Sequence, residues 1–176
     1  MVEMMVAMAI FTVVGLAMMS LYMFSSRSLA SLANYATLDI ANRQAMDQLT
    51  YELRQAKQIS DYTTNATTSS ISLINGDGET IQYLFNMSSQ TLVRNNLLTG
   101  EHKVLLNNCS LLAFDLRQRN PMDGNFDIYP VATNNWQMTV KVLQLTWKTT
   151  QRLPTGVSSS ENVQTARIVI RKQQDS

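Results

Sequence analysis

Cysteine and histidine are almost absent from this sequence. The chain of 176 residues contains one cysteine, Cys109, and one histidine, His102. A single cysteine excludes a disulfide or a cysteine-based metal cluster within the chain, and a single histidine excludes a site built on two histidines. No set of nucleophile, base and orienting group can be identified. We therefore expect a protein that is not an enzyme and that uses no metal or other cofactor.

Helix-breaking residues are scarce in the first part of the chain. The first proline is Pro121, and Gly15 is the only glycine before Gly76. Nothing between Met4 and Lys57 forces a break, so one helix of more than fifty residues is predicted. A strong excess of charge is also lacking, because the formal net charge is +1. The sequence therefore shows no electrostatic footprint for a nucleic-acid partner.

A long apolar run occupies the start of the chain. No charged residue occurs from Met4 to Phe24, a segment that includes Phe11 and Gly15. About 20 apolar residues in a helix are enough to cross a hydrocarbon core of roughly 30 Å. Residues 1–24 therefore predict a single membrane span. The alternative is a cleaved signal peptide, which would have a basic start and an apolar run of roughly 7–15 residues. This run is longer and begins beside an acidic residue, Glu3.

Residues 25–58 predict a continuation of the helix with one buried face. Apolar residues recur three or four positions apart, at Leu38, Ala41, Ala45, Leu49, Leu53 and Ala56. The opposite face is charged and is predicted to be exposed, with Asp39, Arg43, Asp47, Glu52, Arg54 and Lys57. The helix is thus expected to be a membrane-spanning half followed by an amphipathic half.

Residues 59–176 predict a β-rich globular domain. After a polar connection at residues 61–70, the apolar period changes to two, which is typical of strands. Asn75-Gly76-Asp77-Gly78 predicts a hairpin turn between strands at residues 70–74 and 79–85. Further strands are expected at residues 91–94, 103–106, 111–116, 138–148 and 164–172, with a loop at 120–125 and a Gly/Ser-rich segment at 154–162. The predicted fold is α+β, in which the amphipathic half of the helix covers an antiparallel sheet of six or seven strands.

Other candidate sites have simpler interpretations. The stretch Asp123-Gly124-Asn125-Phe126-Asp127 has the spacing that starts a calcium loop. The glycine and glutamate that should follow are missing, so a polar turn is favoured, and calcium binding stays open. Cys109 is interpreted as a strand-edge residue and His102 as a solvated turn residue. Two tryptophans are interpreted as packing residues, Trp136 and Trp147.

Glu3 is the most informative single residue. An ionisable side chain at the edge of a membrane span is a functional hypothesis, and the alternative is a carboxylate that lies harmlessly at the headgroup level. The segment Met1-Val2-Glu3-Met4-Met5-Val6-Ala7-Met8-Ala9-Ile10 resembles the N-terminal segment of type IV pilins and pseudopilins. Mature chains of that family begin Phe-Thr-Leu-x-Glu, so Met1 matches the leucine and Glu3 the glutamate. The pattern from Arg43 to Ala56 is similar to the larger minor pilins and J-type pseudopilins.

The resemblance implies a structural subunit of a type IV pilus or a type II secretion pseudopilus, in its initiation or tip complex. The subunit would be anchored in the inner membrane with its domain in the periplasm. Its partners would be other major and minor pilins or pseudopilins, an inner-membrane assembly platform and a prepilin peptidase. Glu3 would be the residue for subunit assembly. The family also implies Phe-Thr and a short basic leader before Met1, which would satisfy the positive-inside rule, so we expect a start that has been trimmed.

A single-span periplasmic binding or sensor domain is the alternative from another functional class. In such a protein Glu3 would be incidental. Simple anchors usually release their domain through a flexible tether, whereas here the apolar helix is predicted to continue directly into the amphipathic one. The sequence leaves open which pilus or secretion machine the subunit would serve.

Overall fold

The computed structural model describes residues 1–120, 122, 128–131, 136–152 and 159–170. One long helix, α1 (Val2–Gln55), precedes the strands, as predicted. It is 54 residues long, or about 80 Å at 1.5 Å per residue. The helix ends where Ala56 adopts an extended conformation, with φ −64° and ψ 133°.

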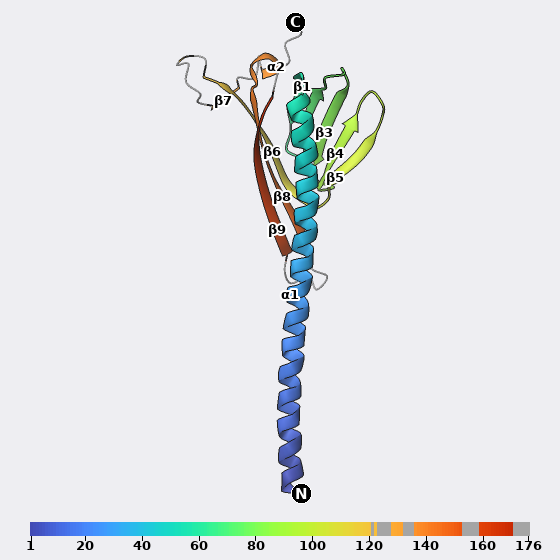
Figure 1. Ribbon diagram of the computed structural model, residues 1–176, viewed down its shortest axis with the longest axis vertical. Coiled ribbons are helices and arrows are strands. Elements are labelled where there is room, and N and C mark those ends of the chain that lie inside the picture. The colour runs from blue at the N-terminus through green and yellow to red at the C-terminus, as the bar shows by residue number, and fades with distance from the viewer. Residues whose placement is uncertain (121, 123–127, 132–135, 153–158, 171–176) are drawn as a thin grey trace.

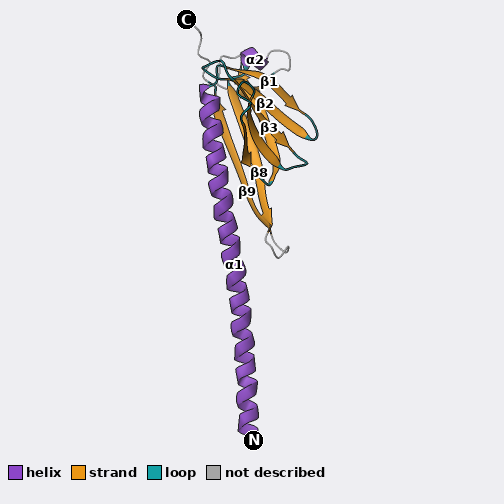
Figure 2. Ribbon diagram, turned by 90° about the vertical axis from the view of Figure 1, so that its right-hand side faces the viewer, coloured by secondary structure: helices purple, strands orange, loops and turns teal. Residues whose placement is uncertain are grey.

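The two halves of α1 have different surroundings. All side chains of residues 1–30 are exposed, and the first buried residue is Leu38. The first half therefore extends beyond the domain as a bare rod, while the second half lies against the strands (Figures 1 and 2). In the part of the chain that is described, α1 is the one helix long and apolar enough to cross a membrane.

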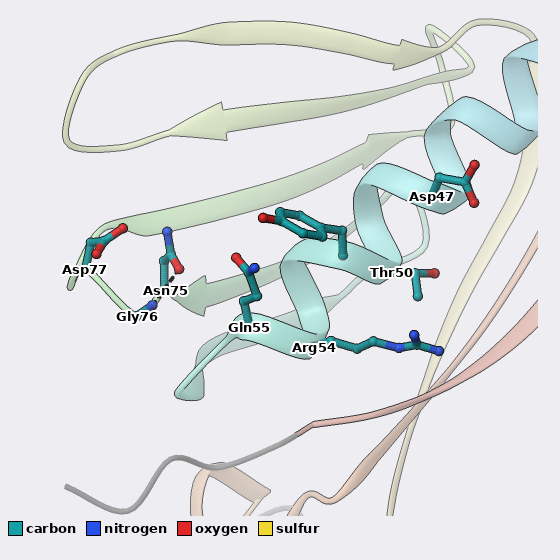
Figure 3. A pocket seen from close by; sticks show the side chains of 8 residues that line it. Asp47, Thr50, Arg54, Gln55, Asn75, Gly76 and Asp77 are labelled. Atoms are coloured by element: carbon teal, nitrogen blue, oxygen red, sulfur yellow. Dashed lines mark hydrogen bonds between the residues drawn. The ribbon is translucent and has the colours of Figure 1, made fainter.

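The first sheet is a five-stranded antiparallel meander in sequence order. Its strands are β1 (Gln58–Thr64), β2 (Thr68–Ile74), β3 (Thr80–Asn86), β4 (Thr91–Asn96) and β5 (His102–Leu106). The predicted hairpin turn is confirmed between β2 and β3, where Gly78 has a φ of 82° and donates its N–H to the Asn75 carbonyl at 3.0 Å. This turn lies beside the C-terminal end of α1 (Figure 3).

The prediction of a polar connection at residues 61–70 is wrong. Most of these residues belong to β1 and the start of β2, which pair from Gln58 with Ile74 to Thr64 with Ser69. Threonine and tyrosine are good strand formers. Because β1 is an edge strand with exposed Thr63 and Thr64, its composition resembles that of a loop.

The second sheet has four strands in the order β7-β6-β8-β9. They are β6 (Cys109–Arg119), β7 (Ile128–Pro130), β8 (Val142–Arg152) and β9 (Ser159–Val169), with the short helix α2 (Trp136–Thr139) before β8. The prediction of antiparallel pairing is confirmed. The prediction of a single sheet of six or seven strands is wrong, because the described residues form nine strands in two sheets. The strand that was predicted to start at Met138 starts at Val142. The end of the predicted Gly/Ser-rich segment is not a loop, because β9 already begins at Ser159.

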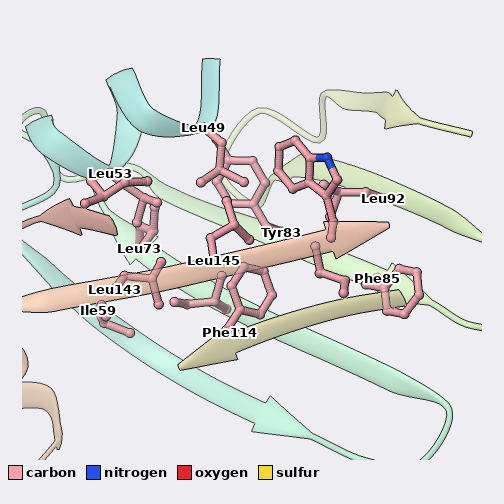
Figure 4. Close-up of a cluster of buried hydrophobic side chains, with 14 of the residues drawn as sticks. Leu49, Leu53, Ile59, Leu73, Tyr83, Phe85, Leu92, Phe114, Leu143 and Leu145 are labelled. Atoms are coloured by element: carbon pink, nitrogen blue, oxygen red, sulfur yellow. The ribbon is translucent and has the colours of Figure 1, made fainter. Parts of the chain in front are cut away.

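The core lies where α1 and the inner faces of both sheets meet. Leu49 and Leu53 of α1 are fully buried in one cluster with Tyr83 of the first sheet and Leu145 of the second (Figure 4). Trp147 of the second sheet belongs to the same cluster. Burying one such large apolar side chain stabilises a fold by roughly 1.5–3 kcal/mol. The predicted apolar face of α1 is confirmed at most of its positions, namely Leu38, Ala45, Leu49, Leu53 and Ala56, whereas Ala41 is half-buried.

Candidate functional site

Glu3 lies in the first turn of α1, at the end of the molecule farthest from the domain (Figure 1). Its side chain is exposed, and among the residues described it has no ion-pair or hydrogen-bonding partner. A carboxylate in this position interacts favourably with the positive end of the helix dipole. Among the described residues, therefore, only the end of its own helix interacts with this charge.

The surface around the span is almost uniformly apolar. Met4, Phe11 and Phe24 are 69%, 79% and 73% exposed. The two aliphatic hydroxyls of the span are satisfied within the helix, because Thr12 donates to the Ala9 carbonyl at 2.8 Å and Ser20 to the Ala17 carbonyl at 2.9 Å. A Cβ atom at Gly15 would meet nothing within 4 Å. The span thus presents a surface suited to lipid or to the apolar helices of other proteins.

A second apolar surface continues along α1 beyond the span. Leu29, Leu32 and Ile40 are 64%, 64% and 57% exposed, and Ala36 lies between them on the same line. We call Leu29, Leu32, Ala36 and Ile40 the outer stripe. Because Leu38 follows Leu29 by nine residues, or about 180° of helix rotation, the stripe faces away from the domain. Ile40 is about 24 Å along the helix from Phe24, so a bilayer around the span does not cover the far end of the stripe.

A buried polar group fixes α1 to the second sheet. Asn42, fully buried, donates from Nδ2 to the Thr149 hydroxyl at 2.8 Å and accepts from the Trp147 indole N–H at 3.1 Å. Nearer the end of the domain closest to the span, the Tyr35 hydroxyl donates to the Glu161 carbonyl of β9 at 2.7 Å. These bonds set both the height and the rotation of the helix on the sheet.

A charged group fixes α1 to the first sheet, and here one prediction is wrong. Glu52 was expected on the exposed face, but its side chain is only 14% exposed and accepts hydrogen bonds from Arg94 Nε at 2.9 and 3.0 Å. It also accepts from the Tyr83 hydroxyl. Burial opposes the charge of Arg94, but the hydrogen bonds and charge of Glu52 outweigh it and raise the pKa of Arg94. Burial, together with Glu52, raises the pKa of Tyr83 well above its ordinary range.

The remaining candidates do not form a reactive centre in the described residues. Cys109 starts β6 and is fully buried, and burial raises the pKa of its thiol to about 11, so the nucleophilic thiolate is scarce at neutral pH. His102, predicted in a turn, instead begins β5, where its Nδ1 lies 2.7 Å from Asn95 Oδ1. Trp147 is a buried packing residue, as predicted, and Trp136 begins α2.

No metal site is found in the part of the chain that is described. No three histidine, cysteine, aspartate or glutamate residues gather closely enough to hold an ion there. The calcium-like stretch from Asp123 to Asp127 lies outside the described residues.

Comparison with known proteins identifies no relative of this chain. The chain matches no protein-family model, no curated protein and no solved structure. The architecture is a long N-terminal helix, apolar in its first half, whose second half packs on antiparallel sheets. This arrangement is compatible with a pilin-like fold.

Proposed function

We propose that this protein is a structural subunit of the pilin type, a minor pilin or pseudopilin that is anchored in a membrane and then assembled into a filament. The observation that carries the proposal is the continuity of α1. One unbroken helix joins an exposed apolar half, with Glu3 at its tip, to a half that forms the core of the domain. A plain membrane anchor has no need of a stiff connection to its domain.

In this proposal the subunit waits in the inner membrane through the segment from Met4 to Phe24, with its domain in the periplasm. During assembly, the apolar helices of several subunits form the core of the filament. Glu3 would then be buried in apolar surroundings, where an unpaired carboxylate costs several kcal/mol. The N-terminal amine or a backbone donor of a neighbouring subunit would neutralise it. Only some axial offsets provide that partner, so the charge selects the register between subunits.

The outer stripe supports the same role outside the membrane. A helix that served only as an anchor would be expected to be polar on its solvent-facing side once it left the bilayer. Leu29, Leu32, Ala36 and Ile40 instead extend the apolar surface towards the domain on the free side of α1. In a filament this face would pack against neighbouring subunits. Those neighbours would be other major and minor pilins or pseudopilins, assembled by an inner-membrane platform in the initiation or tip complex of a pilus or a type II secretion pseudopilus. A prepilin peptidase would act on the subunit if a leader is present.

The test is substitution of Glu3 in the full chain expressed with the pilins or pseudopilins of its own cell. Glu3→Ala and Glu3→Leu are expected to leave the protein in the carbonate-resistant membrane fraction. Both should reduce its co-purification with partner pilins at least tenfold, because the register-selecting charge is lost. Met5→Leu is the matched control, since it changes a neighbouring side chain without changing charge.

Two results would count against the proposal. Wild-type incorporation of Glu3→Leu would remove the assembly role of this carboxylate. Failure of the unaltered chain to co-purify with any pilin would favour a single-span anchored binding or sensor domain instead.

A further inference from the structure

A hollow lies at the end of the domain farthest from the N-terminus of α1. Its volume is about 720 Å³, within the roughly 300–1,000 Å³ of small-ligand sites. It lies between the last turns of α1 and the turn that joins β2 to β3 (Figure 3). We call it the distal hollow; its lining residues are Asp47, Thr50, Tyr51, Arg54, Gln55, Asn75, Gly76 and Asp77.

The polar groups of the distal hollow have few partners among the described residues. Among the described residues, Asp47, Arg54 and Asp77 form no ion pair, whereas the partly buried Glu52 and Arg94 on neighbouring elements are paired. Gln55 likewise has no side-chain partner there, so its amide is free both to donate and to accept. Donors and acceptors thus line one hollow without satisfying one another.

The turn beside α1 adds an oriented donor. The Gly76 N–H donates to Asn75 Oδ1 at 2.5 Å, which fixes the amide of Asn75. Since the oxygen is used in the turn, the Nδ2 group remains available as a donor. Figure 3 shows the Asn75 oxygen turned towards Gly76 and the Gln55 side chain on the same side of the hollow, while Arg54 extends the other way.

An aromatic ring completes the set. Tyr51 is 63% exposed, so most of this side chain is open to solvent at the hollow. A tyrosine combines a flat apolar face with a polar hydroxyl. It therefore offers a surface on which a partly apolar ring of a ligand can lie.

The chemistry of the lining narrows the class of ligand. Sites for apolar molecules are lined mainly by hydrophobic side chains, and Tyr51 is the one large apolar surface among the eight lining residues. Anions favour clustered cations, but the lining has two carboxylates and only one guanidinium, that of Arg54, which extends away from Asn75 and Gln55 (Figure 3). A neutral ligand rich in hydroxyl groups fits better, because each hydroxyl both donates to a carboxylate and accepts from an amide or guanidinium N–H.

We propose that the distal hollow binds a neutral saccharide. The C–H face of one pyranose ring lies on Tyr51, and its hydroxyl groups bond to Gln55, Asn75 and Asp77. The site is at the opposite end of the molecule from Glu3 and the span, so it faces away from the membrane whether or not the protein assembles into a filament. The inference therefore does not rest on the proposed assembly role.

The experiment uses the full chain in lipid nanodiscs. It is applied to an array of immobilised oligosaccharides with neutral hexose or N-acetylhexosamine ends, beside sialylated and sulfated ones. We expect binding to at least one neutral saccharide, and calorimetric titration with that saccharide then gives its affinity. Tyr51→Ala and Gln55→Ala should each weaken binding at least tenfold, whereas Tyr51→Phe, which keeps the ring, should stay within threefold.

Gln44→Ala is the matched control, because Gln44 is an exposed glutamine on α1 that does not line the hollow. It should bind as the unaltered chain does. Thermal unfolding of every variant checks that the fold is intact, which is expected because Tyr51 and Gln55 are exposed. The proposal is overturned if no neutral saccharide binds, if only charged saccharides bind, or if Tyr51→Ala binds as well as the unaltered chain. A photoreactive group at position 51 that captures a protein, without any saccharide binding, would equally overturn it in favour of a protein-docking site.

Discussion

Asn42 is a polar residue in the middle of the buried face of α1, and its two hydrogen bonds make it a sensitive point of the fold. Asn42→Leu would leave the Trp147 indole N–H without a partner and remove one bond of Thr149. A buried donor without a partner costs roughly 1–3 kcal/mol. We expect a loss of about 2–4 kcal/mol in the free energy of unfolding, measured by urea titration in detergent micelles with tryptophan fluorescence.

Gln44→Leu tests whether that loss is specific to the buried site. Gln44 lies two residues further on and is exposed, so the same kind of substitution there should change the stability by less than about 0.5 kcal/mol. Equal effects of the two substitutions would mean that the hydrogen bonds of Asn42 do not stabilise the fold.

Cys109 predicts a dependence of stability on alkaline pH. Burial raises the pKa of its thiol from 9.0 to about 11 in the folded chain. Between these values the unfolded chain loses the proton and the folded chain keeps it, so stability is complete below about pH 9 and falls as the pH rises to 11. The effect is at most about 1.4 kcal/mol per pH unit. Cys109→Ala should remove this component, as seen by comparing its unfolding free energies at pH 8 and pH 10.5 with those of the unaltered chain.

Residue patterns predicted the apolar face of α1 but not its polar exceptions. The positions of Leu38, Leu49 and Leu53 were predicted because apolar residues recur there three or four positions apart. Asn42 and Glu52 do not, because a buried polar side chain is defined by partners on distant strands, here Trp147 and Arg94. The free polar groups of the distal hollow were missed for a related reason: only the folded chain brings Asn75 next to Gln55.

At the scale of elements, the bare middle of α1 is the part most open to a clean test. Residues 25–30 are all exposed and precede the first buried residue of α1, Leu38, so their helical conformation depends mainly on the hydrogen bonds of the helix itself. Ala30→Pro removes a backbone donor and costs about 3 kcal/mol in a helix interior. We expect a kinked or broken rod, seen as a broadened distance between spin labels at residues 20 and 40, while the thermal midpoint of the domain changes little.

Ala30→Ser provides the control, since serine keeps the backbone N–H and an exposed helix tolerates it. Its distance distribution should match that of the unaltered chain. A narrow, unchanged distribution for Ala30→Pro would show that the rigidity of the rod does not depend on this turn.

Elements with strong local signals were predicted and those without were not. The absence of proline and the scarcity of glycine gave the full length of α1, and the Asn75–Gly78 turn gave the β2–β3 hairpin. The strand β1 and the start of β9 were read as loops, because edge strands rich in serine and threonine carry little apolar alternation. The division into two sheets depends on pairings such as Leu111 with Lys148, which no local pattern specifies.

For the whole molecule, the separation of span and domain predicts independence in folding. Residues 1–24 are exposed throughout and the core begins at Leu38. A chain that begins at residue 25 should therefore be soluble without detergent. Its thermal midpoint by circular dichroism should lie within about 3 °C of that of the full chain in micelles. A markedly lower midpoint would mean that the span stabilises the domain.

The continuity of α1 also has a geometric consequence. A helix couples translation to rotation: each residue adds about 1.5 Å of rise and about 100° of turn. Because Asn42 and Glu52 clamp the domain to one side of α1, the domain cannot turn independently of the rod. If the contacts around Glu3 moved by a single residue, the domain would move by only about 1.5 Å along the helix axis but would rotate by about 100° around it. The packing of the anchor therefore determines the rotation of the domain about the helix axis, at the other end of a helix about 80 Å long. This rotation decides in which direction the distal hollow faces.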